Sequence, residues 1–452
     1  MCDVGVSAQK PTTASLGVAA LVAIGVGGMV GGGIFSVLGL TVQVAGAGAY
    51  LSFVVGGVVA ALTGFSYARL SVAVRSRGGT ATFLDRAFGI GVAGPLNVLL
   101  WLSYFVMLGL YAVAFSAYLA ALVGLDPNGG WGRVFASAVV VAFAVLNLAR
   151  AQLVGRAESV LVYFKLAVLV AFCAGGLAFV HGTRVAPSAF PPLSSIVYAG
   201  TLIFLAYEGF ELIANASEDA REPARSLPRA YLVAIGTVIC LYVLVAFVAV
   251  GNLAPAKIAA DRDYALAAAA QPFLGSAGFK LIAVAAVVST ASAINATLYG
   301  AAKFTYLMAR DGELPARLGK PVWDRPIGGL LATTAGTLVI VNTVDIEGIS
   351  LMGSAGFLVI FAAVNLAAWR LLANARLAAT VEIAGALACC GCLVALIAYA
   401  VTHVPGQLGV LGGLLGTAIV GEALVRRRRA GKARSRSPAT GSAWARADPS
   451  DP

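Results

Sequence analysis

Lys165, Glu208 and Glu211 are ionisable residues that lie inside long apolar stretches of the sequence. A charge at the centre of a bilayer costs about 3 kcal/mol or more, so such residues usually mark a pathway for ions or substrate. The acids could instead be buried, hydrogen-bonded structural groups, and Lys165 could extend its amine to the membrane surface. Both interpretations stay open for each residue. If Lys165 is buried, its amine could load and release a proton, because burial disfavours a charged amine.

A glycine-rich stretch, Gly25–Phe35, offers main-chain groups instead of side chains. Six of its eleven residues are glycine, and it lies within an apolar run from about 16 to 42. Glycine destabilises a helix by about 1 kcal/mol relative to alanine. At membrane depth, freed main-chain groups are tolerated only beside protein or a water-filled cavity. We therefore expect a break that turns N–H and C=O groups toward a polar guest. A glycine face for close helix packing is the alternative.

Glu208 and the adjacent Gly209 suggest a second break, in the sixth apolar segment. Segments one and six hold corresponding places in two halves of five spans, the pattern of transporters with inverted repeats and a site between broken helices. Half-helix N-termini offer N–H donors to an anion, and C-terminal ends offer carbonyls to a cation. An α-amino acid carries both charges on one carbon, so it is the simplest solute for this arrangement.

Composition identifies the class of protein that holds these residues. The chain has 452 residues, of which 60% are hydrophobic and 11% charged, against about 25% charged in soluble domains. We predict an all-α membrane protein with twelve transmembrane helices. The apolar segments are 16–42, 48–73, 90–123, 131–148, 158–180, 195–216, 229–251, 277–308, 327–343, 349–373, 379–402 and 406–425.

The distribution of charge predicts the orientation. With the N-terminus inside, most Lys and Arg residues fall in inside loops and in the C-terminal tail, as the positive-inside rule requires. The net charge of +11 is therefore a topology signal, and we expect no nucleic-acid partner. The protein is expected in the plasma membrane, in contact with the lipid bilayer, with both termini cytoplasmic. Its oligomeric state is not set by the sequence.

The predicted organisation follows from the segments. The parts are a cytoplasmic N-terminus (1–15), a first repeat (16–180), a second repeat (195–373), two further spans (379–425) and a basic, disordered cytoplasmic tail (426–452). The six cysteines resemble small packing residues. The sequence has no catalytic constellation, metal-ligand cluster or phosphate loop followed by a soluble fold, so we expect no enzyme, no cofactor and no metal.

Four stretches, in order and in register, resemble the amino acid–polyamine–organocation permeases, and most closely the proton-coupled amino acid transporters. They are Gly31–Phe35, Arg77–Thr80, Tyr207–Glu211 with its continuation to Ala230, and Tyr306–Pro315. The resemblance implies the LeuT-type fold: a five-plus-five inverted repeat with helices 1 and 6 broken, and two extra C-terminal helices.

The resemblance also implies roles by position. The turn Gly31, Gly32 and Gly33 would bind the substrate carboxylate, with the N–H groups of Gly32 and Gly33 as donors. Where many relatives carry Ser or Ala, Gly32 lacks a side chain, so the main chain would have to suffice. The implied acceptors for the substrate ammonium are the carbonyls of Met29, Leu205 and Glu208.

Further implied roles concern the gate and the coupling ion. Leu205 stands where many relatives have an aromatic gate, so Phe204 or Tyr207 would serve instead. A lysine at the position of Lys165 marks proton-coupled members, in which the amine replaces a sodium ion. The opposite wall of that cation site would be Ser289 and Thr290.

These expectations combine into a proton-coupled symporter that imports α-amino acids by alternating access, with a lean toward neutral ones. The alternatives are an amino acid or polyamine exchanger of the same fold and a non-transporting membrane receptor for amino acids. Tyr104, Asn295 and Ser354 are candidates to line the side-chain pocket. The sequence does not show which of them face it, or which amino acid is carried.

Overall fold

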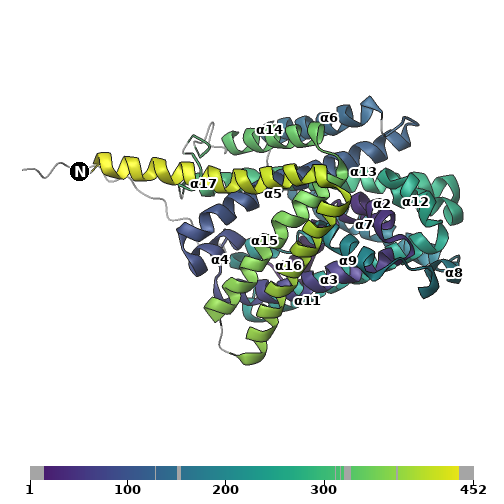
Figure 1. Ribbon diagram of the computed structural model, residues 1–452, viewed down its shortest axis with the longest axis horizontal. Coiled ribbons are helices and arrows are strands. Elements are labelled where there is room, and N and C mark those ends of the chain that lie inside the picture. The colour runs from purple at the N-terminus through teal and green to yellow at the C-terminus, as the bar shows by residue number, and fades with distance from the viewer. Residues whose placement is uncertain are drawn as a thin grey trace, which may run out of the picture.

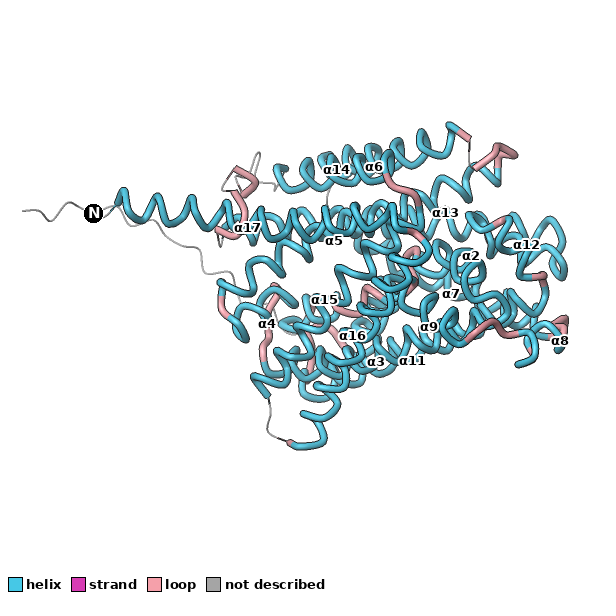
Figure 2. The backbone as a smooth tube through the Cα atoms, in the orientation of Figure 1, coloured by secondary structure: helices cyan, strands magenta, loops and turns pink. Residues whose placement is uncertain are grey.

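The computed structural model describes residues 15–127, 129–149, 154–310, 312–315, 317–319, 327–372 and 375–436. Within these ranges the chain is helical, with short connecting loops (Figure 2). No strand occurs in this part of the chain; one isolated bridge pairs Leu16 with Ala220. The α-helices are α1 (Val18–Met29), α2 (Gly33–Ala45), α3 (Ala49–Ala73), α4 (Gly79–Phe88), α5 (Ile90–Leu122), α6 (Gly130–Ala149), α7 (Val154–Leu177), α8 (Gly182–Val185), α9 (Leu193–Leu202), α10 (Leu212–Asn215), α11 (Pro223–Asn252), α12 (Pro255–Ala260), α13 (Ala265–Arg310), α14 (Ile327–Thr343), α15 (Ile346–Leu372), α16 (Arg376–His403) and α17 (Leu408–Arg436).

Each of the twelve predicted apolar segments overlaps one of these helices or a broken pair. Among the described residues, eight helical stretches are long and apolar enough to cross a membrane, or nine with the bent pair that contains α9 and α10. Three shorter apolar helices also occur, in 18–29, 327–343 and 405–421. The chain is therefore a multi-span helical membrane protein. Twelve spans and an inverted repeat stay predictions.

The helices pack into one bundle (Figure 1). The pair α6 and α14 lies along one edge, against α5 and α13, and α3 contacts α11, α15 and α16. Helix α17 projects beyond the bundle and continues to Arg436, so residues 426–436 of the predicted disordered tail are helical. Residues 437–452 of that tail and residues 1–14 of the predicted N-terminal segment lie outside the described part.

The first apolar segment is interrupted inside its glycine-rich stretch. Helix α1 ends at Met29, Val30–Gly32 form a turn, and α2 begins at Gly33. We call the stretch from Gly27 to Ile34, which contains this turn and the helix ends next to it, the first break. Helix α1 packs on α11, whereas α2 packs on α9 and α12. The two halves of the segment therefore contact different parts of the bundle.

The sixth segment is interrupted as well, and its two parts are bent by 51°. A 3-10 turn, η3 (Phe204–Tyr207), joins α9 to an irregular stretch before α10. We call the stretch from Ile203 to Glu211 the second break. Gly209, at φ +123°, adopts a main-chain conformation that favours glycine. A Cβ on Gly28 would lie 2.8 Å from the Gly209 carbonyl oxygen, so the two breaks are in contact through glycines.

Main-chain hydrogen bonds join the residues just before α1 to the connection between α10 and α11. The N–H groups of Ser15 and Leu16 donate to the Asp219 carbonyl (3.1 and 3.0 Å), and the Arg221 N–H donates to the Leu16 carbonyl (2.8 Å). Arg77, after α3, forms exposed ion pairs with Glu218 (3.4 Å) and Asp219 (3.1 Å). We call the three main-chain bonds the entry bridge.

Helix α16 is held to α3 and α15 by polar side chains. Arg69 on α3 pairs with the fully buried Glu382 on α16. Close by, Ser66 donates to Asn365 (2.6 Å), which donates to Thr63 (3.0 Å). These groups fasten α3, α15 and α16 together, so we assign them a structural role.

Candidate solute-binding site

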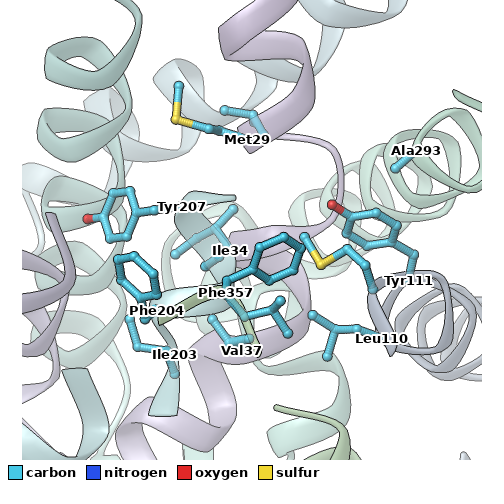
Figure 3. Close-up of a cluster of buried hydrophobic side chains, with 14 of the residues drawn as sticks. Met29, Ile34, Val37, Leu110, Tyr111, Ile203, Phe204, Tyr207, Ala293 and Phe357 are labelled. Carbon is cyan, nitrogen blue, oxygen red and sulfur yellow. The ribbon is translucent and has the colours of Figure 1, made fainter. Parts of the chain in front are cut away.

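The two breaks face each other inside a shell of side chains from other helices. Figure 3 shows Met29 and Ile34 of the first break near Phe204 and Tyr207 of the second, with Tyr111 of α5, Ala293 of α13 and Phe357 of α15 around them. Except for Ala293, which is 8% exposed, these side chains are at most 2% exposed. Helices α5, α13 and α15 therefore converge on the two breaks.

Two side chains from different helices, Lys165 on α7 and Ser289 on α13, bind carbonyl groups of the first break. The Lys165 amine on α7 is 2% exposed and donates to the Gly27 carbonyl at 2.9 Å. Lys165 is therefore buried and does not extend to the membrane surface. The Ser289 hydroxyl on α13 contacts the carbonyls of Val30 (2.9 Å) and Gly31 (2.5 Å).

Thr290, the second residue of the predicted cation-site wall, is turned to its own helix. Its hydroxyl donates to the Ala286 carbonyl at 2.7 Å. Lys165 and Ser289 thus contact the first break, whereas the Thr290 hydroxyl is occupied within α13. Among the described residues, no group of three His, Cys, Asp or Glu side chains could hold a metal ion.

Tyr242 on α11 occupies another carbonyl of the first break. Its hydroxyl donates to Met29 at 2.7 Å, and its side chain is fully buried. The predicted role of the Met29 carbonyl was to receive the substrate ammonium, and in this structure the Tyr242 hydroxyl binds it. The carbonyls of Gly27, Met29, Val30 and Gly31 therefore all accept a hydrogen bond from a protein side chain.

Unlike these carbonyls, the N–H groups of Gly32 and Gly33 form no hydrogen bond among the described residues. Helix α2 begins at Gly33 without a side-chain cap and without an acidic residue in its first turn. A helix N-terminus in this condition presents unmatched donors and the positive end of the helix dipole, which together favour an anion.

The surroundings of these glycines explain why the sequence has no side chain there. A Cβ on Gly33 would lie 2.6 Å from the Ala206 carbonyl oxygen and 2.9 Å from the Tyr242 hydroxyl. A Cβ on Gly32 would overlap the Tyr111 ring. The close approach of the second break and α11 therefore favours glycine at position 33, and a side chain at position 32 would require the Tyr111 ring to move.

In the second break, some carbonyls are also occupied. The Leu205 carbonyl, a predicted acceptor for the ammonium, accepts the Glu208 N–H at 3.1 Å. Ser354 on α15 bridges the interruption, since its hydroxyl donates to the Leu202 carbonyl (2.7 Å) and accepts the Leu205 N–H (3.1 Å). Ser354 thus supports the main chain of the break.

The candidate gate residues are held by neighbouring helices. The Leu205 side chain packs against Gly353 on α15. A Cβ on Gly353 would lie 2.7 Å from the Leu205 side chain. The Tyr207 hydroxyl donates to the Phe53 carbonyl at 2.7 Å, and Phe204 makes an edge contact with Phe361. Their gating role stays a prediction.

Glu208 and Glu211 are both buried, at 6% and 1% exposure. One oxygen of Glu211 accepts the Gly209 N–H at 2.7 Å, and the other has no partner among the described residues. Two buried acids therefore lie in the second break, which contacts the first break through Gly209.

Sequence reasoning missed three contributors: Tyr242, Ala206 and the bridging function of Ser354. A tyrosine in a transmembrane span needs a partner for its hydroxyl, and this need could have drawn attention to Tyr242. Asn295, a candidate for the pocket, accepts a hydrogen bond from Asn147 at 2.8 Å. For these residues the relevant contact depends on helix rotation, which the sequence pattern does not specify.

Comparison with known proteins gives a consistent family. The amino acid permease family model matches residues 16–422. The chain is 36% identical over 342 residues to an uncharacterized protein, MJ0609, of Methanocaldococcus jannaschii, covering 75% of this chain and 79% of that protein. It is 31% identical over 387 residues to the inner membrane transport protein YbaT of Escherichia coli, covering 85% and 89%. It is 26% identical over 381 residues to a methylthioribose transporter of Bacillus subtilis, covering 80% and 82%. The match over most of the length shows that this chain belongs to the amino acid permease family.

Proposed function

We propose that this permease transports an α-amino acid, with a lean toward neutral ones, by proton-coupled symport into the cell. One observation carries the proposal. In the first break, the carbonyls from Gly27 to Gly31 accept hydrogen bonds within the protein, whereas the N–H groups of Gly32 and Gly33 donate none among the described residues. The break therefore has surplus donors and suits a carboxylate.

The choice of solute class rests on this surplus. Family membership alone does not set it, because the name of one relative specifies methylthioribose, a sugar derivative. A carboxylate placed at Gly32 and Gly33 would accept two main-chain N–H bonds at the N-terminus of α2. Hydrogen bonds to a charged group contribute about 1.5–3 kcal/mol each, which is enough to select for a carboxylate.

Proton coupling is supported by the contact between Lys165 and Gly27. Gly27 lies in the same break as Gly32, and the Lys165 amine binds its carbonyl from α7 at 2.9 Å. A protonated amine holds this carbonyl more strongly than a neutral one, since charge-assisted hydrogen bonds are roughly twice as strong. Protonation of Lys165 would therefore change how firmly α1 is attached to α7, and would couple the proton to the solute site.

Transport into liposomes tests the proposal. Purified protein is reconstituted, and uptake of labelled L-alanine is measured with the lumen alkaline relative to the outside. We expect accumulation above the outside concentration, lost when a protonophore collapses the gradient. Empty liposomes are the control.

Three other results would each contradict the proposal in whole or in part. Uptake that needs unlabelled amino acid in the lumen and ignores the pH gradient would identify an exchanger. Binding of amino acid without any uptake would identify a receptor. Absence of both binding and uptake across a panel of amino acids would refute the carboxylate site.

A further inference from the structure

We propose that residues 74–80, the turn between α3 and α4, form a latch on α10, the short helix that follows the second break. The latch holds α10 in the position seen here, and its opening is a step of transport. Helix α10 contacts α1 and α4, so its position affects both interrupted segments. The inference goes beyond the groups that bind solute, and it rests on the proposed function only in that transport moves α10.

At the surface, the latch is an arginine that pairs with two acids. Arg77 lies 3.4 Å from Glu218 and 3.1 Å from Asp219, both in the 3-10 turn η4 that follows α10. The three side chains are between 32% and 52% exposed, so dissolved salt screens these pairs. Exposed ion pairs change an equilibrium constant by about 1.4- to 5-fold. A contact of this strength closes and opens readily.

Behind the ion pairs, hydroxyl and main-chain groups join the same two turns. The Ser217 hydroxyl accepts the Ser76 N–H and donates to the Ser76 carbonyl, both at 3.3 Å, and Ser217 is fully buried. Gly79, at φ +47°, packs on Asn215, the last residue of α10, and a Cβ on Gly79 would overlap the Asn215 side chain. The turn and the end of α10 are therefore in close contact, with donors and acceptors matched.

An aromatic contact connects the latch to the second break. The hydroxyls of Tyr67 and Thr80 share a hydrogen bond at 2.8 Å. The Tyr67 ring makes an edge contact with Phe210 of the second break, with centroids 5.4 Å apart, and both rings are fully buried. The second break therefore cannot move away from α3 without breaking the aromatic contact next to the latch.

The connection after α10 is thus held in two chemically different ways. The entry bridge joins Asp219 and Arg221 to the residues before α1 through peptide groups, which carry no net charge. The latch joins the same connection to α3 and α4 in part through charged side chains. Salt weakens interactions between exposed charges, so it should weaken the latch and leave the entry bridge.

The experiment uses this difference. Purified full-length protein is reconstituted into liposomes, and exchange of labelled for unlabelled L-alanine is measured in about 10 mM and about 1 M salt, between which the screening length falls from about 30 Å to about 3 Å. We expect the wild type to exchange about 1.4- to 5-fold faster in high salt. Arg77→Gln, which has no charge to screen, should exchange at the faster rate in both.

Arg225→Gln is the matched control. Arg225 forms an exposed pair with Glu222 at 3.8 Å at the start of α11. This pair lies close in sequence to the latch acids, but it lies within one turn of the chain and joins no second element. The variant should keep the wild-type exchange rate and the wild-type response to salt.

Denaturation of the same proteins tests the latch independently of transport. Arg77→Gln should raise the unfolding equilibrium constant by about 1.4- to 5-fold in low salt, and so should the combined change Glu218→Gln and Asp219→Asn. The acid changes alter side chains only, so the entry bridge is kept. Because both changes remove the same ion pairs, all three substitutions together should destabilise by less than the sum of the two effects.

Three results would overturn the inference. Strictly additive effects in denaturation would show that Arg77 and the acids do not interact. An exchange rate in Arg77→Gln that equals or falls below the wild-type rate in low salt would show that the contact does not hold α10 back. An equal gain in Arg225→Gln would trace the effect to surface charge in general. If the wild type exchanges no L-alanine, the proposed function fails and the transport step of this inference fails with it, whereas the denaturation result still decides whether the contact between Arg77 and the acids exists.

Discussion

Gly33→Ala tests whether close contact between the two breaks is required for solute binding. The added Cβ would lie 2.6 Å from the Ala206 carbonyl oxygen, 2.9 Å from the Tyr242 hydroxyl and 3.1 Å from the Ala206 Cα. Favourable separations between non-bonded carbon atoms are about 3.5–4.0 Å. Two of the three atoms belong to main chain and have no rotamer that avoids the methyl group. The start of α2 must therefore move away from the second break.

The size of the effect follows from the cost of overpacking. Inserting one methyl group into a well-packed interior costs about 1–3 kcal/mol, which corresponds to about 5- to 150-fold in an equilibrium constant. Because the displaced N–H groups are those of Gly33 and its neighbours, we expect this cost to appear as weaker L-alanine binding. It should also appear as a lower melting temperature.

Gly236→Ala is the matched control. Gly236 lies in α11, and a Cβ there would have no atom within 4 Å. Alanine is favoured over glycine in a helix by about 1 kcal/mol, so this variant should be at least as stable as the wild type and bind equally well. Calorimetry with L-alanine and thermal denaturation in detergent measure both quantities. Wild-type binding by Gly33→Ala would refute the requirement for contact, and equal defects in both variants would refute the steric explanation.

Three further predictions concern other parts of the chain. Lys165→Ala should abolish uphill accumulation in liposomes while leaving exchange of labelled for unlabelled L-alanine, because the variant lacks the proton-carrying amine; full uptake driven by a pH gradient would contradict this. Ser354→Ala should lower the free energy of unfolding by about 1–3 kcal/mol, measured by denaturation, because two main-chain groups lose their partner; unchanged stability would count against the bridge. Glu382→Gln should lower the free energy of unfolding by about 1–3 kcal/mol. This is less than the loss expected for a fully buried pair, because Arg69 is 23% exposed. L-alanine affinity should not change, and a weakened affinity would connect this pair to the site.

The sequence is most informative where composition itself determines structure. Six glycines in eleven residues disfavour an uninterrupted helix, and α1 ends at Met29 within the predicted stretch. The position of Glu208 before Gly209 likewise indicated the second interruption. Apolar length indicated a many-span helical protein. These features depend on neighbours in sequence, so local physics suffices to predict them.

Contacts between distant segments were not predictable in the same way. Tyr242 and Met29 are separated by 213 positions, and Ser354 and Leu202 by 152. A buried tyrosine or serine in an apolar segment is compatible with many rotations of its helix. Which carbonyls of the breaks are occupied, and which N–H groups are left, therefore required the packed structure. The inverted repeat and the number of spans also remain predictions.

The entry bridge has a consequence for how this protein tolerates mutation. Its three bonds, at Ser15, Leu16 and Arg221, use only peptide groups. Exchanging the side chains there leaves every donor and acceptor in place, apart from proline, which has no N–H. If α1 moves during a transport cycle, the hydrogen bonds that resist this movement are main-chain bonds and do not depend on the side chains. Substitutions at Ser15, Leu16 or Arg221 would therefore change the rate of this movement little, except for proline, which removes one of the donors.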